Sequence, residues 1–531
     1  MARNPEVRQQ LITLSATQQR AELHRTIWAI AESLRGSIDG WDFKAYVLGF
    51  LFYRYLSENL TNYVNSRERQ VPDQEHFDYA KITDEQAAKI RSQLTEDRGF
   101  FIKPSQLFQN VVARCETDPN LNITLSEIFG YIESSSHRHA SAKDFDGLFN
   151  DINLNTDRLG ATVTERNHRI VKILHAIADM KLGDFKDNSI DAFGDTFEYL
   201  MKMYAANGGK SGGEFYTPQE VSYLLTKLAL GDKTFINKVY DPTCGSGSLL
   251  LQSAKILGPE NIESGFFGQD NNLTTVRLCK INMFLHDIPY DHFNIQYGDT
   301  LLDPKHWDYE PFDVIVSNPP FSTLWPGDSD PQLIEDPRFA PADVLAPRHK
   351  KADLAFVMHS LAWLSEKGAA AIVCWPGIFY RKGAEAKIRD YLVKNNFIDA
   401  VIEIPANLFF GTSVTTCILV LKKNKTDNNI LFMDASECYV KAVNSNRLSD
   451  ADIEKILKGY FDRVSVPHFV QLVPITDIPG PDYNLSPSTY VEAEDRREKI
   501  NIEELNASVD ALISEVNSLH HQIVEIVREI G

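Results

Sequence analysis

The residues whose types and order best define a chemistry are Asn318-Pro319-Pro320-Phe321, which directly follow the apolar run Phe312–Ser317. The exocyclic amine of adenine or cytosine is a poor nucleophile, because its nitrogen lone pair is delocalised into the ring. The side-chain amide oxygen of Asn318 and the backbone carbonyl of Pro319 can accept from the two N–H groups, which favours a tetrahedral nitrogen. Proline preorganises this arrangement, and Phe321 offers a ring face on which an extruded base can stack. The motif therefore predicts methyl transfer to an amino nitrogen, and by itself it leaves both a base and a protein amide open as acceptors.

A glycine-rich turn precedes this motif, and its sequence is Asp241-Pro242-Thr243-Cys244-Gly245-Ser246-Gly247-Ser248. We expect it to join a strand, Lys238–Asp241, to a helix, Leu249–Ile256. Glycine lets the backbone approach a ligand closely, and the first amides of a helix can bind a carboxylate. The spacing differs from that of dinucleotide-binding turns. Asp241 can accept from the ammonium of a methionine moiety, so the turn predicts a site for S-adenosylmethionine.

Two further aspartates stand at the ends of the next two expected strands. Asp270 ends the strand Gly265–Asp270, where nucleotide sites use an acid to accept from ribose hydroxyls. Asp299 closes the third strand, Phe293–Tyr297, and could accept from an adenine amino group. We expect Asp241, Asp270 and Asp299 to lie at one ligand-facing edge and to hold one cofactor.

Glu214-Phe215-Tyr216-Thr217-Pro218-Gln219 follows a glycine-rich segment and has the sequence of a helix start. Thr217 is the expected N-cap and Pro218 the expected first helical residue.

The elements that must position these residues are predicted by strand–helix alternation from Lys238 onward, which is typical of an α/β fold with a doubly wound, mostly parallel sheet. Such sheets bind ligands beyond the carboxyl ends of their strands. The expected strands are Lys238–Asp241, Gly265–Asp270, Phe293–Tyr297, Val314–Ser317, Ala369–Trp375, Asp399–Ile404 and Thr415–Leu421, with helices between them such as Thr274–Leu285 and Phe356–Leu364.

The two ends of the chain are expected to be helical. Thr26–Leu34 and Tyr46–Leu56 have apolar residues at three- and four-residue spacings, which predicts an all-α N-terminal domain. At the other end, apolar residues from Ile502 to Ile530 repeat at alternating steps of three and four, and no Pro or Gly interrupts them. Such a seam packs against another helix. We favour an intersubunit coiled coil and leave open a helix that folds back on its own domain.

Charge and composition restrict the class of protein. The net charge at pH 7 is −19, whereas a protein that grips duplex DNA alone usually carries a basic surface. A local basic patch or a partner subunit must then supply most of the contacts to the phosphates of any DNA substrate. The apolar runs are too short for a membrane span, and the polar N-terminus predicts no secretory signal. The six scattered cysteines predict neither a metal site nor a disulfide framework and fit a reducing cytoplasm.

The three acids, the glycine turn and Asn318–Phe321 together resemble the cofactor and catalytic motifs of DNA adenine-N6 methyltransferases, with a Rossmann-like sheet. Gly213–Pro218 looks like their remaining cofactor motif. The segments Thr26–Gly36 and Ala45–Glu58 are similar to the N-terminal domain of the modification subunit of type I restriction–modification systems. The resemblance covers nearly the whole chain. One departure is that Cys244 and Ser246 stand where several relatives carry other small residues.

The resemblance implies transfer of a methyl group from S-adenosylmethionine to N6 of adenine in a specific DNA sequence, in the cytoplasm of a bacterium or archaeon. It implies as partners duplex DNA with a flipped adenine, a specificity subunit that reads the DNA, a second modification subunit and, in some assemblies, a restriction subunit. The catalytic residues it implies are Asn318, Pro319, Pro320 and Phe321. The cofactor-binding residues are Glu214, Phe215, Tyr216, Thr217, Pro218, Gln219, Asp241, Gly245, Ser246, Gly247, Ser248, Asp270 and Asp299, and no metal site is implied.

We divide the chain into a helical N-terminal domain (1–165), a methyltransferase domain (166–430), a connecting region (431–494) and a heptad helix for subunit association (495–531). Only about 110 residues follow the last expected strand, which leaves little room for a domain that reads DNA sequence. The long loop Ser322–Ala352, with Arg348-His349-Lys350-Lys351 near its end, either borders the DNA and orders on binding or is a solvated surface.

Two other functions remain. A protein methyltransferase that acts on glutamine side-chain amides uses a closely related motif, more often with Tyr at the position of Phe321, and it would leave the N-terminal domain unexplained. A non-enzymatic scaffold is less consistent with intact Asp241, Asp270, Asp299 and Asn318.

Overall fold

A computed structural model of the protein describes residues 21, 23–28, 40–180, 182, 192–207, 217–345, 351–409, 413–442, 445–480, 482–493 and 502–531. These residues form two compact units, Met1–Val491 and Glu492–Gly531. Within the described residues, no helix combines the length and the apolar character that crossing a membrane requires.

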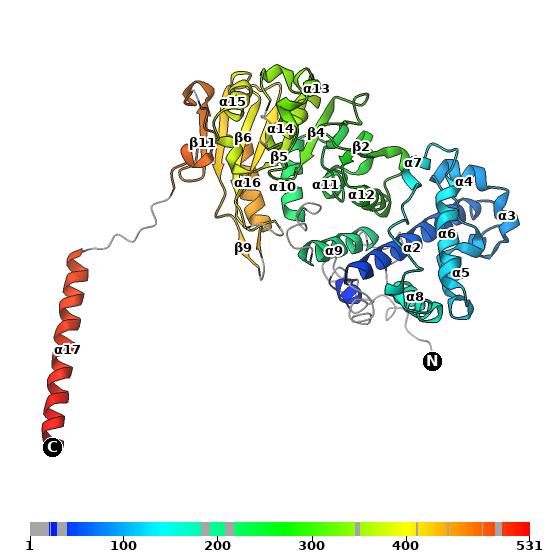
Figure 1. The fold of residues 1–531 in the computed structure, drawn as a ribbon, viewed down its shortest axis with the longest axis horizontal. Coiled ribbons are helices and arrows are strands. Elements are labelled where there is room, and N and C mark those ends of the chain that lie inside the picture. The colour runs from blue at the N-terminus through cyan, green and yellow to red at the C-terminus, as the bar shows by residue number, and fades with distance from the viewer. Residues whose placement is uncertain are drawn as a thin grey trace, which may run out of the picture. The chain divides into compact units, whose positions relative to one another are not determined.

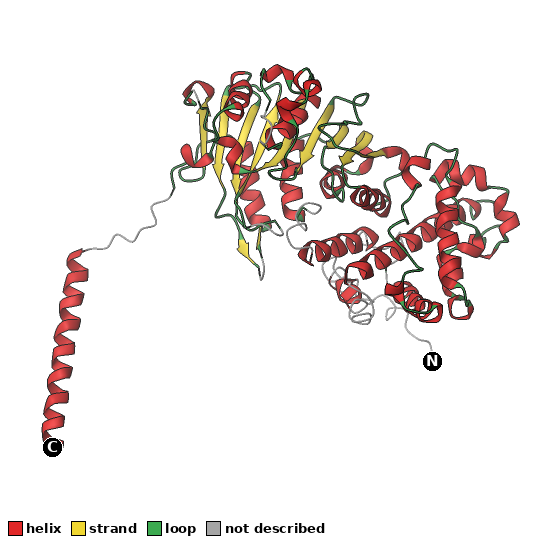
Figure 2. Ribbon diagram, in the orientation of Figure 1, coloured by secondary structure: helices red, strands yellow, loops and turns green. Residues whose placement is uncertain are grey.

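Nine strands of the first unit form one sheet in the order β11-β8-β6-β7-β5-β4-β1-β2-β3 (Figures 1 and 2). Neighbours pair in parallel except that β7 is antiparallel to β5 and β6, and β11 is antiparallel to β8. The strands are β1 Ile236–Asp241, β2 Ile262–Asp270, β3 Phe293–Tyr297, β4 Phe312–Ser317, β5 Leu364–Cys374, β6 Ile398–Ile404, β7 Thr416–Lys422, β8 Asn429–Asp434 and β11 Val470–Pro474. The short strands β9 Val440–Lys441 and β10 Asn446–Arg447 form a separate hairpin.

Helices cover both faces of the sheet, because its central strands are apolar on both sides. Val239 and Val314 point into one buried cluster, and their chain neighbours Tyr240 and Ile315 point into the other. The first face is covered by α10 Gln219–Leu230, α11 Ser248–Leu257, α12 Leu273–Leu285 and α16 Asp450–Asp462, and the second by α14 Asp353–Trp363, α15 Ala384–Lys394 and the short α13 Pro331–Ile334 (Figure 1). The predicted doubly wound α/β sheet is therefore confirmed.

The N-terminal region is helical, as expected, and it packs beside α12. Its helices are α2 Gly40–Glu68, α3 Asp84–Ala88, α4 Arg91–Arg98, α5 Phe108–Val112, α6 Leu121–Ser135, α7 Ala142–Phe145 and α8 Val163–Ala178, followed by α9 Ala192–Asn207. The hydroxyl of Tyr55 on α2 donates to Asp287 Oδ1 at 2.6 Å, and Arg277 on α12 pairs with Asp151 at 3.0 Å. These bonds fix the helical domain to the sheet's β3 side.

The strands expected from the sequence are all present, with ends shifted by a few residues. Helix α14 ends at Trp363, and Leu364, expected as its last residue, already belongs to β5. The sheet also continues past residue 430, since β8 and β11 extend it and α16 covers it. The segment 431–494 thus contributes to the same sheet, and the domain boundaries stay predictions.

Among its described residues, the second unit contains helix α17, Ile502–Ile530. Taken by itself, it exposes its apolar seam: Ile502, Leu512 and Val516 are 69%, 61% and 63% exposed. A soluble helix with an unburied seam of this length needs a partner surface.

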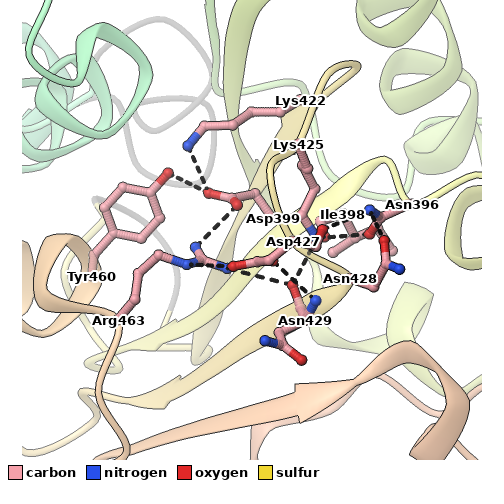
Figure 3. Close-up of polar contacts among 10 residues, drawn as sticks. All are labelled: Asn396, Ile398, Asp399, Lys422, Lys425, Asp427, Asn428, Asn429, Tyr460 and Arg463. Atoms are coloured by element: carbon pink, nitrogen blue, oxygen red, sulfur yellow. Dashed lines mark hydrogen bonds and ion pairs between the residues drawn. The ribbon is translucent and has the colours of Figure 1, made fainter.

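A charged cluster stabilises the sheet edge opposite the carboxyl ends of the parallel strands (Figure 3). Asp399 at the start of β6 accepts from Tyr460, Lys422 and Arg463 at 2.5, 3.0 and 3.0 Å. Arg463 also pairs with Asp427 at 3.2 Å. Burial alone would raise the pKa of Asp399, but the two neighbouring cations and the Tyr460 bond outweigh it, so the pKa lies below its usual value.

Replacing Asp399 by Ala should lower the free energy of unfolding by about 3 kcal/mol, because it leaves buried donors without their acceptor. Since the folded-state pKa of Asp399 is lowered, its contribution is present at neutral pH and is lost as pH falls through the carboxylate range. Thermal melts of wild type and Asp399→Ala at pH 7 and at about pH 2.5, below the usual carboxylate range, measure this. If the difference in melting temperature between wild type and Asp399→Ala does not become smaller at the lower pH, this account of Asp399 is contradicted.

Candidate active site

The predicted site residues that the structure describes lie around the point where the strand order reverses. The chain runs from β1 to β2 and β3 on one side and returns to β4 on the other, and sheets of this kind bind ligands at such a switch point. Asp241 ends β1, and Asn318 directly follows β4. The hydroxyls of Thr243 and Ser317 share a hydrogen bond of 2.9 Å, which joins the two loops. The glycine turn and the Asn-Pro-Pro-Phe motif are therefore neighbours in space.

Asn318 is held so that one polar atom of its side chain remains available. Its Nδ2 donates to the Thr217 hydroxyl at 3.1 Å. Its Oδ1 is buried and has no hydrogen-bond partner among the described residues. A buried amide oxygen without a donor is costly, and a donor from outside the chain would satisfy Asn318 Oδ1.

The expectation for Thr217 as the N-cap of a helix beginning at Pro218 is wrong. Helix α10 begins at Gln219, and Pro218 is the N-cap, with a carbonyl that accepts from Val221 and Ser222 at 3.0 and 2.9 Å. Pro218 has ψ 140°, an extended value that excludes it from the helix. The Thr217 hydroxyl is instead engaged by Asn318, a long-range contact that local sequence gives no sign of. Glu214, Phe215 and Tyr216 lie outside the described residues.

Thr217→Val should lower kcat about tenfold by removing the acceptor that orients the Asn318 amide, with a smaller effect on cofactor affinity. Thr217→Ser, which keeps the hydroxyl, is the matched control. Steady-state methyl-transfer kinetics and equilibrium cofactor binding separate the two effects. Equal losses in the Ser and Val variants would show that the hydroxyl is not the important group.

Phe321 is half-buried and packs edge-to-face against Phe409, with ring centroids 6.3 Å apart at 87°. Phe409 lies beyond the end of β6 and is buried. Ser322, the next residue, has φ +62° and donates its amide to Asp353 Oδ1 at 3.1 Å. Phe321 follows Asn318 by three residues. These contacts restrict the position of the Phe321 ring, as a stacking platform requires.

The glycine turn adopts the close-approach geometry expected from its sequence. Gly245 and Gly247 have φ +54° and +82°, which favour glycine. A Cβ on Gly247 would lie 2.8 Å from Cys279 Sγ, so a larger residue would force the Cys279 side chain to shift. Ser248 begins α11, and the turn therefore presents backbone amides at a helix N-terminus.

Asp241 is fully buried, and only one of its carboxyl oxygens is engaged. Oδ1 accepts from the Thr243 amide at 3.0 Å, whereas Oδ2 has no partner within the described part of the chain. Burial, with a contribution from the charge of Asp270, raises the pKa of Asp241 to about 8. A cationic ligand would favour the ionised form of this carboxyl and would complete its hydrogen bonding.

Cofactor affinity should therefore rise as pH increases toward about 8, where Asp241 becomes ionised before the ligand binds. Below that pH Asp241 is protonated and neutral, so binding a ligand ammonium requires release of its proton. Calorimetry in buffers of different ionisation enthalpy should detect release of this proton at pH 7. Asp241→Asn should remove both the proton release and the pH dependence of the affinity. A pH-independent affinity in the wild type would contradict an ammonium contact at Asp241.

Asp270 and Asp299 organise the neighbouring turns. The Asp270 carboxylate accepts from the Gly245 amide at 3.1 Å and the Asn272 amide at 2.9 Å, and burial raises its pKa. Asp299 Oδ1 accepts from the Leu301 and Leu302 amides at 2.9 and 3.2 Å. Asp299 lies two residues beyond β3, in the turn rather than in the strand.

A cavity of about 710 Å³ opens beside these turns, a size that suits a nucleoside-bearing ligand. Of the predicted site residues, Asp270, Asp299 and Pro320 line it. Residues of the N-terminal region also line it, among them Leu48 and Ile152. Sequence reasoning missed this wall, because apolar residues of a distant helix and loop form no motif. The cavity, the glycine turn and the orphaned Asp241 oxygen together fit S-adenosylmethionine.

The described part of the long loop is packed rather than free. Trp325, Leu333 and Phe339 are buried in the core on the α14 face, and Leu324 forms a β-bridge with Lys351. Arg348, His349 and Lys350 lie outside the described residues, so their expected position beside DNA stays a hypothesis.

The amino-acid sequence is similar to that of known DNA methylases along most of the chain. The N-6 DNA Methylase family model matches residues 188–499, and the HsdM N-terminal domain model matches residues 23–177. The methylase subunit of the type I restriction enzyme MpnII from Mycoplasma pneumoniae is 46% identical over 532 residues, which cover 97% of each chain.

Solved structures are similar over comparable lengths. The methyltransferase subunit of a type I restriction–modification system from Streptococcus thermophilus is 33% identical, with a TM-score of 0.79 over 89% of this chain and 100% of that one. A protein from a structural study of complex assembly and conformational transition in a type I system is 16% identical, with a TM-score of 0.64 over 97% and 99% of the chains. At that identity the likeness concerns the fold alone.

Proposed function

This chain belongs to the N-6 DNA methylase family, among the methylase subunits of type I restriction–modification systems, and we propose from this how its residues perform the reaction. As a member of that family it transfers the methyl group of S-adenosylmethionine to N6 of adenine in DNA. The observation that carries the proposal for the site is the buried Asn318 Oδ1, which lacks a partner among the described residues although Thr217 holds the other end of the amide.

Asn318 and Pro319 activate the base by accepting from its amino group. Asn318 Oδ1 takes one N–H and the Pro319 carbonyl takes the other, which reduces delocalisation of the nitrogen lone pair into the ring. S-adenosylmethionine supplies an electrophilic methyl group on a sulfonium sulfur. The N6 lone pair forms the new N–C bond as the C–S bond breaks, and the two fixed carbonyl dipoles stabilise the positive charge that develops on nitrogen. The surplus proton passes to water, since an amide side chain does not take it up.

The remaining site residues bind rather than react. The Phe321 ring, supported by Phe409, stacks on the adenine that leaves the duplex. Asp241 accepts from the ammonium group of the cofactor, Asp270 from its ribose and Asp299 from its adenine amino group. We also assign cofactor binding to Glu214–Gln219 and to Gly245–Ser248.

Sequence-specific binding depends on partners. The net charge of −19 is unfavourable for holding duplex DNA alone, and the seam of α17 is exposed in its own unit. We assign the heptad helix, 495–531, to association with a specificity subunit, with a second modification subunit and, in the full assembly, a restriction subunit. We assign the helical domain 1–165 to one wall of the cofactor cavity and the methyltransferase domain 166–430 to cofactor binding and methyl transfer, with 431–494 as the connecting region that also completes the sheet. We place the reaction in the cytoplasm, where bacterial or archaeal DNA lies.

Incubating the purified chain with methyl-labelled cofactor and duplex DNA, with and without its specificity subunit, tests this division of labour. We expect label in DNA only when the specificity subunit is present. Label in a protein and none in DNA would instead support a glutamine-amide methyltransferase. No transfer at all, by a complex that binds cofactor and DNA, would support a scaffold.

A further inference from the structure

The most deeply buried cation near the cofactor turns is Arg338, which comes from the long loop between the catalytic motif and α14. Its side chain is 2% exposed. All five of its N–H donors can be accounted for within the protein, although none of the cofactor or substrate roles above uses it. A buried guanidinium is expensive unless its partners are fixed in place, so these contacts identify what the residue holds.

Two of its contacts are backbone carbonyls in the turn that carries Asp299. Nη1 donates to the Thr300 carbonyl and Nη2 to the Leu301 carbonyl, each at 2.7 Å. Inside the same turn, Asp299 Oδ1 accepts from the amides of Leu301 and Leu302. Arg338 therefore holds the turn from outside while Asp299 holds it from inside. Asp299 Oδ2 has no donor within the described part of the chain.

The other contacts of Arg338 connect it to the rest of the site. Nε and Nη2 donate to Asp336 at 3.0 and 2.7 Å, and Nη1 donates to His359 Nδ1 at 3.1 Å. Burial and the charge of Arg338 lower the pKa of His359, which keeps the imidazole neutral. Its Nδ1 then accepts, and its Nε2 donates to the Tyr240 hydroxyl at 3.0 Å.

This chain of contacts ends at the first cofactor turn. Tyr240 immediately precedes Asp241 in β1. Thr300 also donates its hydroxyl to the Pro242 carbonyl at 2.5 Å, which ties the Asp299 turn to the Asp241 turn directly. The loop residue Arg338 thus completes a frame in which the relative positions of two predicted cofactor acids are fixed.

We propose that Arg338 is a positioning residue that sets Asp299 for recognition of the adenine 6-amino group of the cofactor. The proposal rests on the role assigned to Asp299 above. Lysine does not replace the guanidinium here, because a single ammonium does not reach the Thr300 and Leu301 carbonyls, Asp336 and His359 together. Weakening the contact of Arg338 with the Thr300–Leu301 turn should therefore reduce selectivity for the adenine 6-amino group more than it reduces the stability of the fold.

The test compares the affinity of the full-length protein for S-adenosylhomocysteine and for S-inosylhomocysteine, in which oxygen replaces the 6-amino group. We expect the wild type to prefer the adenosyl compound at least tenfold, about the effect of a hydrogen bond to a charged group. In Arg338→Lys the preference should fall below about threefold. A simple loss of stability would lower both affinities and leave their ratio unchanged.

Arg389 supplies a matched control, since it is 1% exposed and donates to the carbonyls of Tyr483, Ile378, Arg381 and Asp482, none of them in a cofactor turn. Arg389→Lys should keep the wild-type preference. If Arg338→Lys does not fold, Asp336→Asn is measured in its place. Its preference for the adenosyl over the inosyl compound should also fall below about threefold.

Each outcome bears on a different statement. A folded Arg338 variant that keeps the wild-type ratio overturns the proposal. A wild type that binds both compounds equally also overturns it, because Asp299 then does not read the amino group. A wild type that binds neither compound contradicts the cofactor site itself.

Discussion

Replacing Asn318 by Ala should lower kcat for DNA methylation by at least about 10²–10³-fold and leave cofactor affinity within about threefold of wild type. The reason is that Asn318 Oδ1 acts only on the target amine, and a preorganised polar group of this kind contributes about 3–4 kcal/mol to the transition state. The hydrogen bonds of Asp241, Asp270 and Asp299 described above do not involve Asn318, whose amide is held by Thr217, so the variant should disturb those acids little. Single-turnover transfer rates and equilibrium cofactor binding are the two measurements.

Thermal stability serves as the control for Asn318→Ala. The wild-type Oδ1 is buried without a donor among the described residues, so its removal should cost little stability. A variant that loses cofactor binding and transfer together would contradict the role assigned to Asn318. A variant that still transfers at near the wild-type rate would contradict it more directly.

Leu512→Asp together with Leu519→Asp should weaken association with the specificity subunit at least about 100-fold and abolish DNA methylation by the mixture. Both leucines belong to the exposed seam of α17, and a carboxylate buried in a helix–helix contact costs several kcal/mol. Cofactor binding should be unchanged, because the cofactor turns belong to the first unit. Co-purification and analytical ultracentrifugation of the two subunits measure the effect.

The matched control is Ala511→Asp with Ser518→Asp, which adds the same charges one residue away from each seam position. These changes should leave association intact. If instead the leucine variants lower the melting temperature of the isolated chain and spare association, α17 folds back on its own domain. That result would replace the intersubunit coiled coil.

The fold was predictable from the sequence where local patterns decide it. Phe293–Tyr297 and Phe312–Ser317 are strands with the bounds of the apolar runs, because central strands of such a sheet are buried on both faces. Strands β8 and β11 were missed. They are the last two strands on one side of the sheet, and the edge strand β11 has only two buried residues among its five positions, without regular alternation, so it gives a weak signal.

The candidate site was predictable to the same degree. The glycine-rich turn was identifiable from its sequence, and the structure gives the reason for Gly247: its positive φ and its close packing both favour glycine. The position of the strand-end aspartates at one edge follows from the parallel topology of the sheet. The contact of Thr217 with Asn318, residues 101 positions apart, was not, since a hydroxyl before a proline reads as a helix cap. Arg338 was also missed, because a lone arginine in a polar loop has no pattern that distinguishes a buried residue from a solvated one.

Nucleoside analysis of DNA methylated by the complete complex tests the central claim most directly. Duplex DNA is treated with the wild-type or the Asn318→Ala complex and labelled cofactor, digested, and separated by mass spectrometry. We expect N6-methyladenine as the labelled nucleoside with wild type and at most a trace with the variant. Label in methylcytosine, or equal labelling by the two complexes, would contradict transfer to adenine N6 through Asn318.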